Sequence, residues 1–419
     1  MWNHNTLCGV ELSRNKEPSE GEDLTSWKVS KPLELHESDE PVKVLHNHSM
    51  LNSENTDNHH HVGSQSNLSV LFYQLGRDSS IECLLHCSRF DYGVIASLNQ
   101  GFRSLIRSGE LYRVRRKMGI VEHCIYFSCI LLKWEAFDPI RCRWMNLPTI
   151  TSADVCFMCT SKQLLAVGTE LLVFGKEINS PVIFKYSILT NTWSSGMNMR
   201  TPRFSFASAS LGEIAILAGG CDLCGNILSS VELYNSESGS WLNLPSMNKS
   251  RKFCTGVFMD GNFYVIGGIG EGNSKRLTCG EVYDPKTRTW HVIPDMFPRR
   301  RAWSNETQAG ADAPPLIAVV KNELFAADHT RMEVQKYVKE KNVWVTLGRL
   351  PEQALSVNGW GLAFKGCGDR LILIAGTSSL NGGIVEINSW IPGDGPPRWN
   401  LLGSKPFGSF VYNCAVMEC

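Results

Sequence analysis

The chain of 419 residues lacks any long hydrophobic run. No stretch reaches the roughly 18 apolar residues that a membrane-spanning helix needs, and the N-terminus lacks the apolar core of a signal peptide. The 41 basic and 41 acidic side chains leave a formal net charge of zero, and the excess of six positive charges past residue 67 is too weak a bias to argue for nucleic acid. We therefore expect a soluble intracellular protein, in the nucleus, the cytoplasm or both, that binds neither a membrane nor nucleic acid.

Motifs of enzyme chemistry are also missing. The sequence contains no phosphate-binding loop, no nucleophile elbow and no zinc-protease helix. Past residue 67 the histidines are too sparse and dispersed for a copper or iron centre; they are His86, His123, His291 and His329. We expect no catalytic residue, no metal and no cofactor, so a metal-dependent enzyme is the least favoured of the functions considered.

The fifteen cysteines are scattered through apolar segments, as free buried thiols are in reducing compartments. Two pairs have the CxxC spacing of zinc ligands, Cys156 with Cys159 and Cys221 with Cys224. The first pair lies in an expected strand, where positions three apart point to opposite faces. No thioredoxin-like βαβ pattern surrounds the second pair. We therefore expect neither a zinc site nor a redox site.

Residues 1–67 have little to bury. They are rich in Ser, Asn, Glu and His, carry 11 acidic and 5 basic side chains, and contain only Trp2 and Trp27 as aromatics. Such a segment cannot offset the entropy of ordering, so we predict a disordered tail. Its NHHHV run at 58–62 is better explained as a polar linker than as a metal tract.

Helical spacing begins at Leu68 and extends to residue 117. Asp78 or Ser79 is expected to cap the first helix, because Glu82 stands three residues beyond Ser79, as a capping box requires. Two apolar stripes follow: Ile81, Leu84 and Leu85, then Val94, Leu98, Phe102 and Leu105. The basic run YRVRRK at 112–117 suits either a nuclear signal or a solvated helix face.

This helical segment resembles an F-box, the module that docks substrate receptors onto a Skp-family adaptor of cullin ubiquitin ligases. The resemblance lies in LGRD at 75–78 and FRSL at 102–105. The family usually has proline and tryptophan where this chain has Gly76 and Phe102, which leaves open whether Gly76 weakens adaptor binding. The resemblance implies that residues 68–117 bind the adaptor, and through it a cullin, by means of Leu75, Ile81, Leu84, Leu85, Leu98 and Phe102.

A tyrosine and a tryptophan recur seven residues apart in the rest of the chain. The pairs are Tyr186 and Trp193, Tyr234 and Trp241, Tyr283 and Trp290, and Tyr337 and Trp344, with Phe137 and Trp144 as a variant. Trp399 continues the series, at intervals of 49, 48, 49, 54 and 55 residues. Each unit contains about four short apolar strands, and radial stacking of such sheets covers both faces of each one.

The repeats therefore predict a mainly β fold, a propeller over residues 124–419. The paired glycines at 219–220 and 267–268 are expected where backbones crowd near the axis. The first unit lacks a first strand, and GSFVYNCAVMEC at the C-terminus supplies a spare one. We predict that this C-terminal strand completes blade one and closes a six-bladed ring.

The spacing and the glycine pairs resemble kelch repeats, and together with the F-box-like module they resemble the plant F-box/kelch-repeat family. The resemblance implies a non-catalytic substrate receptor of a ubiquitin ligase, whose propeller holds an unknown target protein. The alternatives are a kelch scaffold without ligase binding and, least favoured, the metal-dependent enzyme.

The target should meet the propeller face opposite the F-box. In a four-stranded blade, loops between blades and loops after the second strand emerge on one face, whereas the F-box chain should enter on the other, near Cys124. The between-blade loops read MRTPRFS, MNKSRKF and FPRRRAW. We expect them to bring together Arg203, Arg251, Lys252 and Arg301, which would hold acidic or polar target segments, as the resemblance to kelch receptors implies.

Overall fold

The structure, a computed structural model, describes residues 76–130, 133–150, 163–178, 180–271, 276–298, 313–354, 356, 358–377, 383–407 and 414–419. The chain divides into two units, Met1–Ser38 and Asp39–Cys419, and every described residue belongs to the second. The predicted disordered segment 1–67 and the predicted adaptor residue Leu75 lie outside the described residues.

Four α-helices form the N-terminal module: α1 Arg77–Leu85, α2 Tyr92–Leu98, α3 Gln100–Arg107 and α4 Glu110–Lys117, with a 3₁₀ turn at Arg89–Asp91. The predicted capping box is wrong. Gly76 occupies the N-cap of α1 without a side-chain hydrogen bond, so Asp78 and Ser79 lie inside the first turn. There Asp78 instead complements the positive end of the helix dipole.

The remaining chain forms six four-stranded sheets among the described residues. Blade one consists of β24 Cys414–Glu418, β1 His123–Ile130, β2 Lys133–Asp138 and β3 Arg143–Asn146. Blade two consists of β4 Gln163–Val167, β5 Glu170–Lys176, β6 Pro181–Ser187 and β7 Thr192–Ser195. Blade three consists of β8 Ala207–Leu211, β9 Ile214–Ala218, β10 Val231–Asn235 and β11 Ser240–Leu244.

Blade four consists of β12 Thr255–Met259, β13 Asn262–Ile266, β14 Gly280–Asp284 and β15 Thr289–Ile293. Blade five consists of β16 Ile317–Val320, β17 Glu323–Asp328, β18 Glu333–Val338 and β19 Val343–Arg349, with a 3₁₀ turn at Lys339–Lys341. Blade six consists of β20 Leu362–Cys367, β21 Arg370–Thr377, β22 Gly383–Trp390 and β23 Asn400–Phe407, preceded by a 3₁₀ turn at Glu352–Ala354.

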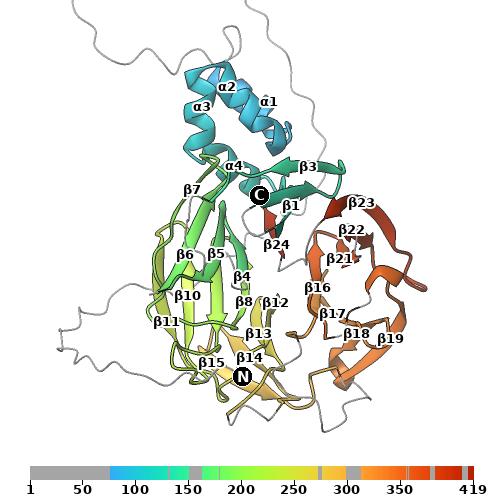
Figure 1. The fold of residues 1–419 in the computed structure, drawn as a ribbon. Coiled ribbons are helices and arrows are strands. Elements are labelled where there is room, and N and C mark those ends of the chain that lie inside the picture. Colours follow the sequence, from blue (N-terminus) through green and yellow to red (C-terminus); the bar gives the residue numbers. More distant parts are fainter. Residues whose placement is uncertain are drawn as a thin grey trace, which may run out of the picture. The chain divides into compact units, whose positions relative to one another are not determined.

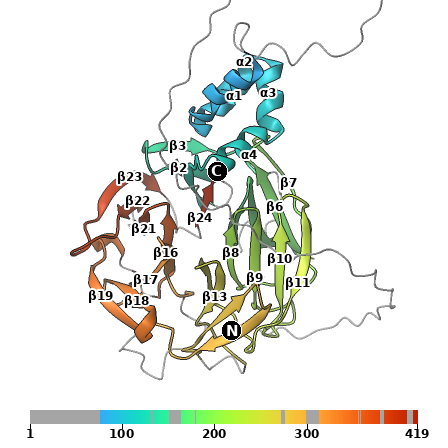
Figure 2. The same cartoon turned by 180° about the vertical axis from the view of Figure 1, so that it is seen from behind.

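The blades close into a ring (Figures 1 and 2). The innermost strands β4, β8, β12, β16, β20 and β24 contact one another in that order, and β24 also contacts β4. The C-terminal strand β24 pairs antiparallel with β1, with Phe127 opposite Cys414 and His123 opposite Glu418. The predicted six-bladed propeller, closed by the C-terminal strand, is confirmed.

The recurring tryptophan joins each of blades two to six to the blade before it. Tyr234 lies opposite Trp241 in the β10–β11 ladder, with ring centroids 4.8 Å apart. The indole N–H of Trp241 donates to the carbonyl of Met197, at the exit from blade two, at 2.9 Å. Equivalent bonds of 2.7 to 3.0 Å run from Trp193, Trp290, Trp344 and Trp399 to the carbonyls of Pro148, Pro245, Met296 and Arg349.

The glycine pairs adopt left-handed backbone conformations where other loops of the same chain pass close by. Gly219 has φ +68°, and a Cβ there would stand 2.4 Å from the carbonyl oxygen of Arg251 in the next loop. Gly220 has φ +91°, and its Cβ would stand 2.5 Å from the carbonyl oxygen of Phe204. Only glycine fits both constraints, which confirms the prediction of backbone crowding.

Candidate functional site

Most apolar residues assigned to adaptor binding form the module's own core. Ile81, Leu84, Leu85 and Phe102 are exposed by only 8, 3, 2 and 4%. They pack in one cluster that continues into blades one and two. Leu98 behaves differently, because 67% of it is exposed, as is Val94 one turn earlier on α2.

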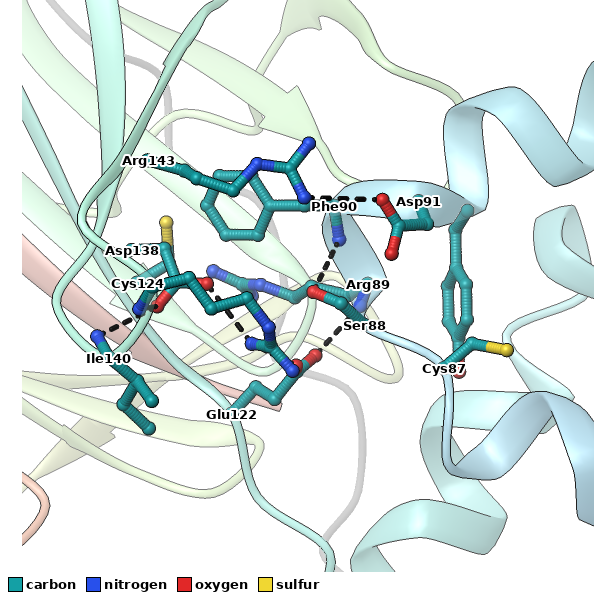
Figure 3. Close-up of polar contacts among 12 residues, drawn as sticks. Cys87, Ser88, Arg89, Phe90, Asp91, Glu122, Cys124, Asp138, Ile140 and Arg143 are labelled. Atoms are coloured by element: carbon teal, nitrogen blue, oxygen red, sulfur yellow. Dashed lines mark hydrogen bonds and ion pairs between the residues drawn. The ribbon is translucent and has the colours of Figure 1, made fainter.

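Glu122 connects the helical module to the propeller (Figure 3). Its carboxylate accepts the backbone N–H of Arg89 at 2.7 Å and pairs with the guanidinium groups of Arg115 at 3.1 Å and Arg141 at 2.9 Å. Its backbone exchanges hydrogen bonds of 2.7 and 3.0 Å with Cys419, at the end of β24. The C-terminal end of β24, the strand that closes the ring, is therefore hydrogen-bonded to the segment between α4 and β1.

The basic run at 112–117 is only partly displayed on α4. Arg115 is 1% exposed and donates to the carbonyls of Leu85 and Cys87 at 3.1 and 2.9 Å. Arg116 pairs with Glu213, which stands before β9 of blade three. Arg115 thus holds the module together, so the alternative of a solvated helix face does not apply to this residue.

Arg203 is not available to a target. Its side chain is buried, and its guanidinium pairs with Glu232 of β10 at 2.6 Å. It also donates to the carbonyls of Ser230 at 2.6 Å and Gly219 at 3.2 Å. Burial lowers the pKa of Arg203, and the Glu232 carboxylate opposes that shift. The expectation that Arg203 holds target carboxylates is therefore wrong, because its guanidinium already pairs with the buried Glu232 carboxylate.

Arg251 repeats this arrangement one blade later. It is 0% exposed, pairs with Glu281 of β14 and donates to the carbonyl of Gly267 at 3.0 Å. Glu281 also accepts the backbone N–H groups of Asn248 at 2.7 Å and Lys249 at 3.1 Å. Each Arg–Glu pair therefore locks an entering loop onto the third strand of its blade, and the target-binding expectation for Arg251 is wrong for the same reason.

Two other residues, Lys252 and Arg301, were also predicted to bind the target. Lys252 is half-buried, and its Nζ lies 6.0 Å from the centroid of the Phe253 ring. Arg301 lies outside the described residues. Lys252 remains a prediction as a target residue.

A cavity of about 320 Å³ opens on the face of the between-blade loops. Phe204 and Phe253, from the loops before β8 and β12, and Trp360, from the loop before β20, contribute aromatic walls. Trp360 is 43% exposed and meets Phe253 edge to face, with centroids 6.4 Å apart. Among the described residues, the cavity's lining includes Lys176 and Lys365 but no aspartate or glutamate.

Phe253 reaches this position through an unusual backbone conformation. Its φ is +53°, and Ser205, which occupies the same loop position in the preceding repeat, has φ +56°. The N–H of Phe253 donates to the carbonyl of Ser205 at 2.8 Å, which ties the two loops together. A bulky residue in the left-handed region is costly, and such strain concentrates at functional sites.

The target face predicted from the sequence consists of basic residues only and does not include Phe253 or Trp360. A signal was present: Trp360 falls outside the regular tryptophan series and stands between Gly359 and Gly361. A tryptophan that no repeat position requires, in a loop, indicates an exposed aromatic surface.

The opposite end of the propeller carries the helical module. A second cavity, of about 440 Å³, is lined by hairpin residues such as Gly168, Gly212 and Gly368 together with Ile120 and Val121 from the segment after α4. The innermost strands run between these two ends. The module therefore enters on the face opposite the between-blade loops, as expected.

Among the described residues, no group of three or more His, Cys, Asp or Glu side chains could hold a metal ion. Cys221 and Cys224 are free thiols, half-buried and exposed, respectively. The other CxxC pair, Cys156 and Cys159, lies outside the described residues. Within the part of the chain that is described, no helix is long and apolar enough to span a bilayer.

The fold and its repeated loops define a kelch-type propeller with an N-terminal helical module. The Kelch motif matches residues 202–248 and 250–297, the two repeats that carry the buried Arg–Glu pairs. The solved structure titled "Structure of YjhT" has a similar fold, with a TM-score of 0.50, 11% identity, and coverage of 66% of this chain and 94% of that chain.

Relatives match this chain over far more than the kelch repeats. F-box/kelch-repeat protein SKIP11 of Arabidopsis thaliana is 60% identical over 360 residues, which cover 85% of this chain and 77% of SKIP11. Another F-box/kelch-repeat protein of the same plant is 54% identical over 96% of each chain. The chain belongs to the F-box/kelch-repeat family.

Proposed function

We propose that this chain is the substrate-recognition subunit of a Skp-cullin-F-box ubiquitin ligase. The observation that carries the proposal is the pairing of two surfaces on one chain, an exposed apolar helix on an F-box-like module and an aromatic cavity on the far face of a kelch propeller. The names of its relatives support this role.

In this proposal the adaptor docks on α2. Val94 and Leu98 are each 67% exposed, and one turn separates them. Apolar side chains this exposed lose contact with water when a partner covers them, which supplies binding energy. Leu84 and Leu85 support docking indirectly, because they hold α1 inside the module's core.

The target meets the cavity beneath the between-blade loops. Phe253 and Trp360 offer flat apolar walls, Lys176 and Lys365 line the same cavity, and the Lys252 ammonium lies 6.0 Å from the centroid of the Phe253 ring. A segment with an apolar or aromatic anchor and flanking carboxylates complements this surface. In this proposal, lysines and aromatic rings select the target, in place of the arginines that the structure shows to be buried.

The proposed mechanism is proximity. A conjugating enzyme modifies target lysines when the ligase holds both partners in suitable geometry, so the receptor contributes orientation and local concentration. The Glu122 junction suits this task, since its bonds to Arg89, Arg115 and Cys419 restrain the module against blade one.

The adaptor surface is tested with the double variant Val94→Asp and Leu98→Asp. Because both positions are exposed, melting of the chain should stay unchanged while co-purification with a Skp-family adaptor is lost. Val343→Asp with Val345→Asp is the matched control, since these β19 valines are 44 and 45% exposed. Adaptor binding that survives in the α2 variant would contradict the proposal and favour a kelch scaffold without ligase binding.

The target cavity is tested with Trp360→Ala and Lys365→Ala together. Captured partners would be compared by affinity purification with the proteasome blocked, alongside a control variant, Leu401→Ala, at an exposed β23 position. Loss of partners in the cavity variant alone supports the site. An identical partner list would place recognition elsewhere on the propeller.

A further inference from the structure

A cavity of about 380 Å³ lies between the helical module and blades one and two. Arg89, Arg103 and Arg107 line it together with Tyr112, Tyr126 and Tyr186. Among the described residues, its lining contains three arginines but no aspartate or glutamate. The volume falls near the lower end of small-molecule sites, which span about 300–1,000 Å³.

Arg89 is the buried member of this set. It is 8% exposed, and its Nη1 donates to the Cys419 thiol. Its Nη2 is buried and has no hydrogen-bond partner among the described residues. The nearby Glu122 carboxylate is engaged by the backbone N–H of Arg89 and by the guanidinium of Arg115, and no ion pair joins it to the Arg89 guanidinium.

The thiol and hydroxyl groups around the Arg89 guanidinium are neutral, and the nearby Glu122 carboxylate accepts the Arg89 backbone N–H. Burial raises the pKa of the Cys419 thiol and of the Tyr112 and Tyr126 hydroxyls, so none of them is ionised at neutral pH. The rings of Phe90 and Tyr126 lie 5.9 and 5.8 Å from the guanidinium carbon and offset part of its desolvation. A buried cation without a paired anion is costly, and an anion in the cavity would remove that cost.

Arg103 and Arg107 extend the positive surface outward. Both are solvent-exposed on α3, and the Nε of Arg103 donates to the carbonyl of Ala96 at 3.1 Å. Of the three lining arginines, Arg103 and Arg107 are therefore the ones that solvent reaches, whereas Arg89 is buried.

We propose that this cavity binds a small phosphate monoester that carries a flat ring. Guanidinium groups match phosphate oxygens bidentately, and a dianion suits a site with three arginines and no carboxylate better than a single carboxylate would. The ring would pack between tyrosine side chains of the module and the propeller, such as Tyr112 and Tyr186. Its occupant would contact both parts of the chain.

The test uses the purified full-length chain and isothermal titration calorimetry. Phenyl phosphate should bind in a 1:1 ratio, inorganic phosphate should bind more weakly and compete, and phenol should give no saturable heat. Arg107→Ala should weaken phenyl phosphate about ten- to a hundredfold, the effect of one lost charge-assisted bond, without lowering the melting temperature. Arg89→Lys keeps the positive charge but removes the bidentate guanidinium, and it should weaken phenyl phosphate binding by a similar factor.

Arg113→Ala is the matched control, because Arg113 is an exposed arginine of α4 outside the cavity. It should leave affinity unchanged. Equal weakening by Arg107→Ala and Arg113→Ala would indicate diffuse charge attraction and overturn the proposal, as would an absence of saturable binding by the wild-type chain. If Arg89→Lys fails to fold, the comparison of the two exposed arginines decides the outcome.

Discussion

Removal of the Arg203 guanidinium should unfold the propeller more readily and leave the target surface intact. In Arg203→Met, the Glu232 carboxylate remains buried beside β10 without its cation. The carbonyls of Gly219 and Ser230 lose a donor in the same step. The variant therefore separates a structural arginine from one that binds a target.

The magnitude follows from the burial of both partners. Breaking a buried ion pair by removing one member costs about 3–5 kcal/mol, because the other charge stays desolvated. The two carbonyls left without their donor place Arg203→Met toward the upper end of that range. In the wild-type chain, the backbone N–H groups of Arg200 and Thr201 donate to the Glu232 carboxylate at 2.8 and 2.9 Å. The double variant with Glu232→Gln leaves no buried charge unpaired, and the amide oxygen can still accept one of these N–H groups. We expect the double variant to cost about 1–3 kcal/mol less than the sum of the single changes.

Urea denaturation followed by tryptophan fluorescence measures these free energies of unfolding. Arg200→Met is the matched control: Arg200 is exposed, and its side chain makes one hydrogen bond, to the carbonyl of Trp241 at 3.1 Å. It should change stability by less than about 1 kcal/mol. If Arg203→Met unfolds at the wild-type urea concentration but loses captured partners, the structural role is refuted and the target-binding role restored.

Three further predictions concern the ring. Trp241→Phe, which removes the N–H bond to Met197 and part of the buried indole, should cost less than Trp241→Ala, which should cost about 3–5 kcal/mol; a Trp241→Phe variant as stable as the wild type in urea denaturation would deny the bond a role. Deletion of residues 408–419 removes β24, so it should lower the melting temperature of the whole propeller and increase hydrogen exchange in α4; exchange confined to blade one would contradict closure. Gly219→Ala should destabilise the chain by about 1–3 kcal/mol, because the methyl group would meet the Arg251 carbonyl at a left-handed φ; Gly239→Ala, also at positive φ but in open space, is the control and should cost less.

In the helical module, the spacing of apolar residues predicts which residues share a helix face. Ile81, Leu84 and Leu85 were recognised as one stripe, and they do pack together. Periodicity says that residues share a face, but not whether that face meets the rest of the chain or a partner. Leu98 belongs to an equally regular stripe and is 67% exposed, because α2 is short and only its N-terminal Tyr92 is buried.

The sequence by itself determined the repeat, the number of blades and the strand that closes the ring, because these follow from spacings of aromatic and glycine residues along the chain. Only the tertiary structure decided which charges are buried. Arg203 and Glu232 stand 29 residues apart, and nothing in their local sequence distinguishes them from surface charges. Their pairing arises when an entering loop folds onto the third strand, and the same kind of long-range contact brings Arg89 to Cys419 across 330 residues. Desolvation and pairing depend on distances in space, so the roles of these arginines could be assigned only once the blades were assembled.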